Sequence, residues 1–125
     1  MFMTPAIQPD FALRHGQQGD ELGNVQLFGG CFFDPLIAQA AKKVVVCVDR
    51  IVDTATIRAN GRLTKLPAAL VHAVVGSPFS AHPSSSAARY DTDETHIRQY
   101  VKASLNAEAF QAYLDHYVRA PKTQE

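Results

Sequence analysis

Residues 44–52 read Val44-Val45-Val46-Cys47-Val48-Asp49-Arg50-Ile51-Val52, and this stretch decides the fold class. Residues 44–48 form an unbroken and mostly β-branched run, which is typical of a strand covered on both faces in a parallel sheet. Cys47 lies inside this run, so we expect it to be buried as a small apolar residue. The segments on either side then show whether helices alternate with strands, as an α/β architecture requires.

Helices are predicted on both sides of this strand. Asp34-Pro35 predicts a helix start, because aspartate caps free amides and proline fits the first helical position. Asp53 predicts the cap of a shorter helix, and residues 70–75 predict a further strand. The buried stripe of the first helix is expected at Leu36, Ile37, Ala40 and Ala41.

Both ends of the chain fit the same layered plan. Residues 11–15 alternate apolar and polar side chains, as a half-buried strand does, and residues 25–28 predict a second short strand. Asp91 and Glu94 predict a helix start, Asn106 predicts the restart of the helix, and residues 121–125 are expected to fray. We therefore expect an α/β fold with a partial, open and mostly parallel sheet flanked by helices, a helical C-terminus and one domain over residues 1–125. The last helix carries a stripe that we expect to face the core: Phe110, Tyr113, Leu114, Tyr117 and Val118.

Composition excludes several classes of function. Twelve basic and twelve acidic residues give a net charge of zero, so nothing indicates a nucleic-acid or anionic-membrane surface. No apolar run approaches the roughly 20 residues of a membrane helix, and the N-terminus lacks the pattern of a signal peptide. We expect a cytoplasmic protein without a disulfide between Cys31 and Cys47. Cys31 follows two glycines and is either a pocket residue or an inert buried thiol.

Two segments follow predicted strands, where open α/β sheets bind their ligands. The first is Gly29-Gly30-Cys31-Phe32-Phe33, whose paired glycines let the backbone approach a ligand closely. The second covers residues 76–86, in which Pro78 and Pro83 stiffen the chain. Its serine hydroxyls and the His82 imidazole are able to hydrogen-bond a carboxylate or a thioester carbonyl. A solvated proline-serine connection before a helix is the other interpretation of this segment.

Other catalytic and cofactor patterns are absent from the sequence. There is no nucleotide-binding glycine motif, and Ser77 stands at the wrong place for a nucleophile elbow. The five histidines, at positions 15, 72, 82, 96 and 116, show no metal-ligand spacing. Glu21-Leu22-Gly23 lies in a polar turn, so we interpret Glu21 as a surface residue. We therefore predict no catalytic side chain and no metal ligand in this chain.

Several blocks of the sequence resemble the alpha subunit of class I CoA-transferases, glutaconate CoA-transferase most of all. The resemblance concerns the C-terminal half of such subunits, and their glycine-rich front half is expected to have no counterpart before Met1. The blocks are Gly23-Asn24-Val25-Gln26-Leu27-Phe28-Gly29, Val44 to Val52, Leu70-Val71-His72-Ala73-Val74-Val75, Pro78-Phe79-Ser80-Ala81-His82-Pro83 and Asp91-Thr92-Asp93-Glu94.

The resemblance implies a reaction and its participants. Such enzymes move CoA between a thioester and a carboxylic acid through a glutamate of the partner beta subunit, which forms a covalent thioester intermediate. Coenzyme A is then a substrate, no cofactor is needed, and the partners are the missing half of the alpha subunit together with a beta subunit. The residues implied to bind substrate are Gly29, Gly30, Phe32, Ser77, Phe79, Ser80, His82 and Ser84.

Two alternatives stay open beside the transferase subunit. Relatives in the same superfamily hydrolyse CoA esters or open CoA-linked rings, and the matching blocks do not separate these activities. The other alternative is an inactive chain that serves in assembly or ligand binding. As a transferase subunit, the chain is expected to be inactive alone and to work within an oligomer.

Overall fold

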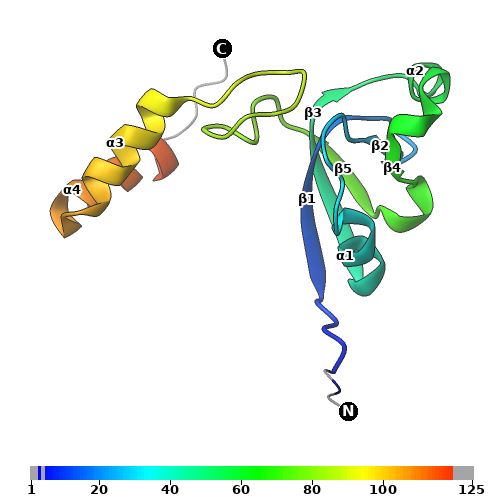
Figure 1. Ribbon diagram of the computed structural model, residues 1–125, viewed down its shortest axis with the longest axis horizontal. Coiled ribbons are helices and arrows are strands. Elements are labelled where there is room, and N and C mark those ends of the chain that lie inside the picture. Colours follow the sequence, from blue (N-terminus) through cyan, green and yellow to red (C-terminus); the bar gives the residue numbers. More distant parts are fainter. Residues whose placement is uncertain (1–2, 4, 120–125) are drawn as a thin grey trace.

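The chain folds into a sheet-based body and a helical arm that extends away from it (Figure 1). This computed structural model describes residue 3 and residues 5–119. Within that part of the chain, five strands form one sheet in the order β4-β2-β1-β3-β5. The strands are β1 (Phe11–Gly19), β2 (Val25–Gln26), β3 (Lys43–Ile51), β4 (Thr64–Leu66) and β5 (Ala73–Gly76).

The sheet is mixed. β3 pairs in parallel with both β1 and β5, whereas β2 pairs antiparallel with β1 and with β4. The α/β class is thus confirmed, but the expectation of a mostly parallel sheet is wrong. The reason is the tight turn between β1 and β2, because such a short connection permits only an antiparallel pair. Asp20 Oδ1 accepts hydrogen bonds from the amides of Leu22 and Asn24 at 3.1 and 2.8 Å, and Gly23 takes a φ of 102°.

Along its apolar run, the central strand β3 is fully buried on one face only. Val44, Val46 and Val48 are fully buried, whereas Val45 and Cys47 are only partly covered. The predictions that this strand is covered on both faces and that Cys47 is buried are therefore wrong. The buried face packs into the core of the body, which also includes a helix residue. The core consists of Ala12, Val25, Leu27, Ala38, Val44, Val46, Val48 and Leu66.

The other face of the sheet exposes apolar side chains. Leu13, Val45 and Ala73 are paired side by side on β1, β3 and β5, and Cys47 pairs with Val75 one step further along. Since paired residues share a face and successive residues alternate, these side chains form one surface. Leu13 is 76% exposed and Val75 is 46% exposed. We call this surface the open face: Phe11, Leu13, Val45, Cys47, Ala73 and Val75.

Two short helices complete the body. α1 (Asp34–Ala40) buries only Ala38, so the predicted stripe through Leu36 and Ile37 is wrong. Asp34 does not cap this helix either; it lies in the first turn and forms an ion pair with Arg14. α2 (Thr54–Ala59) begins as predicted, because Asp53 Oδ1 accepts a hydrogen bond from the amide of Thr56 at 2.7 Å. Single 3₁₀ turns, η1 (Gly61–Leu63) and η2 (Ala68–Leu70), flank β4, so the predicted strand over residues 70–75 is confirmed only from Ala73 onward.

The arm contains α3 (Glu94–Ser104), α4 (Ala107–Leu114) and the π-helical turn η3 (Asp115–Arg119). Asn106 caps α4 as predicted, whereas α3 is capped by Asp93 rather than by Asp91. None of the residues in these three elements is buried. The predicted core-facing stripe instead packs on α3, with Tyr100 centred 5.5 Å from Tyr113 and 6.0 Å from Phe110. The predicted fraying of residues 121–125 lies outside the described residues.

No helix within residues 5–119 combines the length and the apolar character that a membrane span requires.

Candidate functional site

Residues 77–90, which follow β5, fold back over the carboxyl-terminal ends of the parallel strands. We call this segment the 77–90 loop. The amide of Ser77 donates to the Val48 carbonyl at 2.8 Å, which continues the sheet by one bond. Three tight turns follow, closed by amide-to-carbonyl bonds at Ser80, His82 and Ser84 of 3.2, 2.9 and 2.8 Å. The loop is therefore ordered by its own backbone hydrogen bonds.

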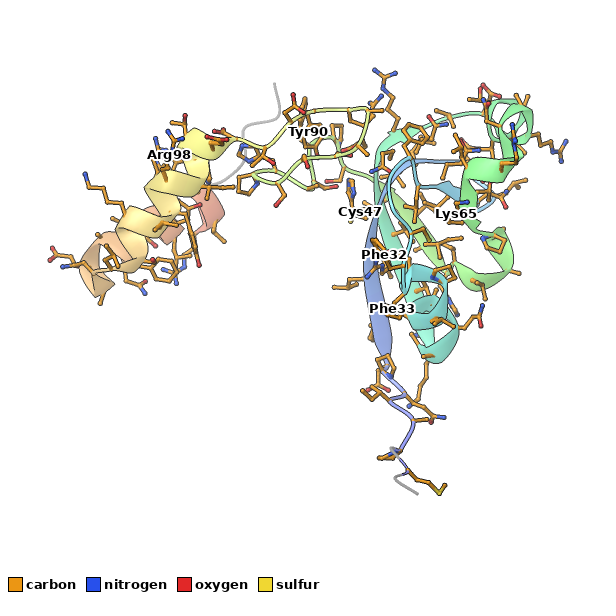
Figure 2. All side chains as sticks on the ribbon, in the orientation of Figure 1. Phe32, Phe33, Cys47, Lys65, Tyr90 and Arg98 are labelled. Carbon is orange, nitrogen blue, oxygen red and sulfur yellow. The ribbon has the colours of Figure 1, made fainter. Side chains whose placement is uncertain are left out.

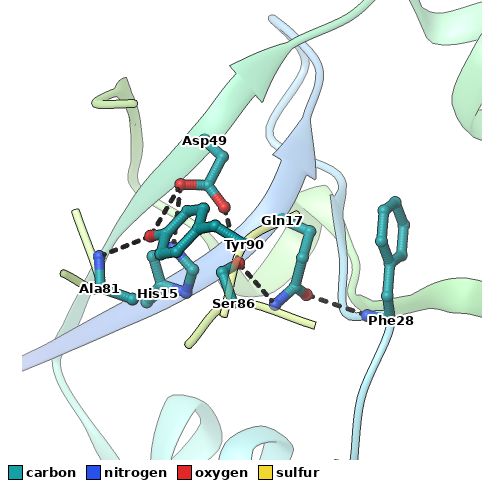
Figure 3. A network of polar contacts seen from close by, with 7 residues as sticks. All are labelled: His15, Gln17, Phe28, Asp49, Ala81, Ser86 and Tyr90. Carbon is teal, nitrogen blue, oxygen red and sulfur yellow. Dashed lines mark hydrogen bonds and ion pairs between the residues drawn. The ribbon is translucent and has the colours of Figure 1, made fainter. Parts of the chain in front are cut away.

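Asp49 anchors the loop to the sheet. This carboxylate lies near the end of β3 and is 5% exposed. Its Oδ2 accepts a hydrogen bond from the Ser86 hydroxyl at 2.7 Å, and its Oδ1 accepts one from the Tyr90 hydroxyl at 3.3 Å (Figure 3). His15 Nε2 lies 3.5 Å from the same Oδ1. A buried charge is stable only when such groups satisfy it, so the loop and the strand fix each other.

Tyr90 is held in its protonated form. Burial of the phenol raises the pKa of Tyr90 above its usual range, and the nearby Asp49 carboxylate raises this pKa further. The hydroxyl therefore donates to Asp49 while it accepts a hydrogen bond from the amide of Ala81 at 3.0 Å. This phenol thus joins the start of the loop, the end of the loop and the sheet at one point (Figure 3).

Gln17 connects the 77–90 loop to Phe28, the residue before the paired glycines Gly29 and Gly30. Its Nε2 donates to Ser86 Oγ at 3.3 Å, and its Oε1 accepts from the amide of Phe28 at 2.9 Å (Figure 3). A Cβ placed on Gly29 would meet the Ala87 methyl at 3.2 Å, so glycine allows a close approach there. The glycine-rich segment after β2 and the 77–90 loop therefore meet at one edge of the sheet.

The aromatic side chains predicted to bind substrate are exposed. Phe32 is 84% exposed beside α1 (Figure 2), and a Cβ on Gly30 would meet the ring of Phe32 at 3.0 Å. Phe79 is 65% exposed, and its ring centre lies 5.0 Å from that of Tyr90. Its backbone takes a φ of 59°, which is a strained conformation for a bulky residue and is concentrated at functional loops. Phe79 is thereby presented at the surface of an otherwise tightly bonded loop.

The predicted polar residues lie in the turns of the same loop. Ser77 is partly covered, whereas Ser80 and Ser84 are exposed. His82 Nε2 lies 3.1 Å from Asp93 Oδ2, so its imidazole is oriented by the residue that caps α3. A hollow of about 330 Å³ is lined by residues 85–91, which follow Ser84 in the chain. The structure thus groups Gly29 with the loop through Ala87, while Phe32 lies over Gly30 on the body.

Sequence reasoning did not predict the network of Gln17, Asp49, Ser86 and Tyr90, although Ser86 belongs to the segment of residues 76–86 that it singled out. One feature pointed to Asp49: it is the first charged residue after the β-branched run, at the carboxyl end of the strand where ligand sites form. Nothing local indicated the others, since Gln17 and Ser86 are 69 positions apart. Glu21 is exposed in the turn between β1 and β2, in agreement with its interpretation as a surface residue.

One group of side chains has the composition of a metal site. His82, Asp93 and His96 bring one ligand atom each to within 4.8 Å of one another. Cys31 and Cys47 are free thiols in the structure, and both are partly covered.

Comparison with known proteins identifies the family. Residues 1–77 match the family model described as coenzyme A transferase, and the chain belongs to this family. A glutaconate CoA-transferase subunit from Acidaminococcus fermentans is 37% identical over 92% of this chain and 36% of its own length. The cholesterol ring-cleaving hydrolase IpdA subunit of Rhodococcus jostii is 32% identical over 94% of this chain and 41% of its own length.

A solved structure shows the same fold. The crystal structure of glutaconate coenzyme A-transferase from Acidaminococcus fermentans superimposes with a TM-score of 0.89 at 36% identity. The match covers 94% of this chain and 37% of the chain in that crystal structure. The body, the 77–90 loop and the arm are therefore the fold of a CoA-transferase chain over a little more than a third of its length.

Proposed function

We propose that this chain forms part of the alpha subunit of a CoA-transferase. The reaction moves CoA between an acyl-CoA thioester and a carboxylic acid, with coenzyme A as substrate and no further cofactor. The nucleophile is a glutamate of a partner beta subunit, which takes the acyl group as a mixed anhydride and then holds CoA as a thioester. This chain supplies pocket residues and no nucleophile, and we expect it to act in the cytoplasm.

The observation that carries this proposal is that two segments meet near the carboxyl-terminal ends of the parallel strands β1 and β3. Gln17 and Asp49 hold the 77–90 loop against the segment that follows β2. We propose that the exposed side of this junction lines the substrate pocket. Backbone at Gly29 and Gly30 approaches the ligand, Phe32 and Phe79 contact its apolar part, and the hydroxyls of Ser77, Ser80 and Ser84 with His82 hydrogen-bond its polar part.

The open face supports the proposal that another polypeptide packs against this chain. Leu13 is 76% exposed and Val75 is 46% exposed, and both belong to one continuous apolar surface. Single exposed apolar residues are common, whereas a continuous apolar surface is normally covered by another part of a protein. We propose that other parts of the alpha subunit cover it and that the beta subunit completes the pocket. Size-exclusion chromatography with light scattering tests this, and we expect self-association or complex formation. A clean monomer that binds no hydrophobic dye at high concentration would contradict it.

His82 provides the sharpest test of the pocket. The test uses a chimera of glutaconate CoA-transferase from Acidaminococcus fermentans. In this chimera, the present chain replaces the matching segment of the similar subunit, and the complex is assembled with the partner subunit of that enzyme. Losing one hydrogen bond to bound substrate costs about 1–3 kcal/mol. His82→Ala is therefore expected to lower kcat/KM roughly 5- to 150-fold, because about 1.4 kcal/mol corresponds to tenfold.

His116→Ala is the matched control, since His116 is an exposed histidine of η3 and lies outside the 77–90 loop. We expect this control to retain kcat/KM within about twofold. If His82→Ala also stays within that range, the loop is a structural connection and the pocket proposal fails.

A CoA-ester hydrolase or ring-cleaving activity is the second candidate, because the IpdA subunit of the ring-cleaving hydrolase matches 94% of this chain. Product analysis of the assembled complex separates the two. A transferase produces a new acyl-CoA from an added carboxylic acid, whereas a hydrolase releases free CoA or opens a ring without it. A non-catalytic role in assembly or ligand binding would give neither product.

A further inference from the structure

The 77–90 loop and the arm meet at a cluster of imidazole and carboxylate groups. His82 belongs to the loop, Asp93 is the cap of α3, and His96 lies in the first turn of that helix. The ring centres of His82 and His96 lie 4.9 Å apart, with the rings inclined at 71°. We propose that these three residues bind a divalent metal ion, with Zn²⁺ as the ion that fits best, and that the ion joins the loop to the arm.

The distances suit a zinc ion. Zinc bonds of about 2.0–2.1 Å in a tetrahedral site place neighbouring ligand atoms about 3.3 Å apart. His82 Nε2 and Asp93 Oδ2 are already 3.1 Å apart, and all three ligand atoms lie within 4.8 Å of one another. Small rotations of the side chains therefore close the site around an ion. The three ligands leave one tetrahedral position for water or another small donor.

The donor set selects the class of metal. Two imidazoles and one carboxylate suit zinc and its neighbours among the first-row transition metals. Ca²⁺ takes six to eight oxygen ligands and Mg²⁺ keeps a near-octahedral oxygen shell, so neither is matched by two nitrogen donors. Co²⁺ shares the preferences of zinc closely enough to serve as its spectroscopic substitute.

Neighbouring groups orient the ligands. Asp93 Oδ1 accepts the amide hydrogen bond of His96 at 2.9 Å, which fixes the carboxylate and leaves Oδ2 towards His82. Tyr113 OH lies 2.6 Å from His96 Nε2, and the Tyr117 ring packs on the same imidazole at 4.6 Å. Such outer contacts are what hold metal-binding histidines in place.

The same contacts have a simpler interpretation without metal, in which Asp93 only caps α3 and pairs with His82. The two interpretations differ in what zinc does to the histidines. In the proposed site, one equivalent of Zn²⁺ occupies both His82 and His96, while His15, His72 and His116 serve as internal controls. Proton NMR of the imidazole rings in the full chain distinguishes them at neutral pH.

The result expected on addition of zinc chloride is a saturable shift of two of the five histidine signals, assigned to His82 and His96 by substitution. Co²⁺ is expected to broaden the same two signals. Equal shifts of all five signals, or no saturation near one equivalent, would overturn the proposal. The titration uses the unchanged chain, so the number of shifting signals does not depend on whether any variant folds; only their assignment uses variants.

Calorimetric titration of variants with zinc chloride gives the second measurement. Asp93→Asn keeps a good helix cap but replaces the charged ligand by a neutral amide. We expect His82→Ala, His96→Ala and Asp93→Asn each to weaken zinc binding by more than about tenfold, and Tyr113→Phe by roughly tenfold, as outer contacts typically do. His116→Ala is the matched control and is expected to bind as the parent does. Unchanged affinity in all three ligand variants would show that the residues form only an ion pair and a cap.

Discussion

The body and the arm of this protein are both rich in apolar residues, but they are stabilised in different ways. In the body, Val46 and Leu66 are fully buried between the sheet and its short helices. In the arm, no residue of α3, α4 or η3 is buried, and the aromatic rings of the two helices contact each other at their edges. Apolar periodicity therefore indicates which side of a helix makes contacts, but it does not indicate whether a core lies there.

The largest expected difference between the two regions is the loss of stability when a leucine is replaced by alanine. Leu66→Ala removes a fully buried side chain from the body and is expected to lower the free energy of unfolding by about 3 kcal/mol, because it leaves a cavity. Leu105→Ala, at a position 84% exposed between α3 and α4, is expected to change it by less than about 0.5 kcal/mol. Urea denaturation followed by circular dichroism measures both.

Similar costs for the two substitutions would contradict the comparison. In that case Leu105 would be covered by another molecule of the chain. Urea denaturation at a lower protein concentration would then show a smaller cost for Leu105→Ala.

Asp49 gives the next largest effect, since it connects the body to the loop that leads to the arm. Asp49→Ala leaves the hydroxyls of Ser86 and Tyr90 without their acceptor and is expected to destabilise the chain by about 2 kcal/mol. The loop should then become sensitive to limited proteolysis while the arm stays helical. Asp49→Asn, which retains an acceptor oxygen, is the matched variant and should be cleaved more slowly. Equal resistance of all three proteins would show that the Asp49 contacts do not hold the loop.

The smallest expected effects concern the stability of the folded chain at low pH. Burial opposes ionisation of Asp20 in the body, but hydrogen bonds from Asn24 outweigh it, so the pKa of Asp20 is lowered. The amide of His96 and the side chain of His82 lower the pKa of Asp93 at the start of the arm. A lowered folded-state pKa contributes stability that is complete above the unfolded pKa of about 3.9 and is lost as the pH falls through the folded pKa.

Both regions should therefore lose stability only below about pH 4, where the unfolded chain takes up the protons first. Hydrogen exchange of β3 and α3 amides between pH 5 and pH 3 separates the two contributions. Asp20→Asn is expected to reduce the acid sensitivity of β3 alone, and Asp93→Asn that of α3 alone. Coupled changes in both regions would mean that body and arm unfold as one unit.

Local chemistry explains what the sequence predicted well. The caps at Asp53 and Asn106 involve amides only two or three residues away, so composition and spacing indicate them directly. The sequence also singled out residues 29–33 and 76–86, because glycine, proline and serine follow predicted strands, and their role as a substrate pocket stays a prediction. The resemblance to CoA-transferases predicted the family that residues 1–77 confirm.

Long-range contacts explain what the sequence did not predict. β4 has three residues and forms only by pairing with β2, and Asp49 reaches Ser86 across 37 positions. The alternation of burial along β3 depends on what covers the second face of the sheet, which a run of valines does not reveal. The group of His82, Asp93 and His96 likewise exists only because the loop returns to the start of α3.

The central claim is that this chain supplies pocket residues but no nucleophile, and covalent trapping tests it most directly. The purified chain is incubated with acyl-CoA and acetate or a dicarboxylate, treated with borohydride and analysed by mass spectrometry. We predict no transfer of CoA and no borohydride-sensitive thioester, because the acidic residue of its one Glu-x-Gly sequence, Glu21, lies in an exposed turn outside the 77–90 loop. A thioester on any residue of this chain would contradict the account.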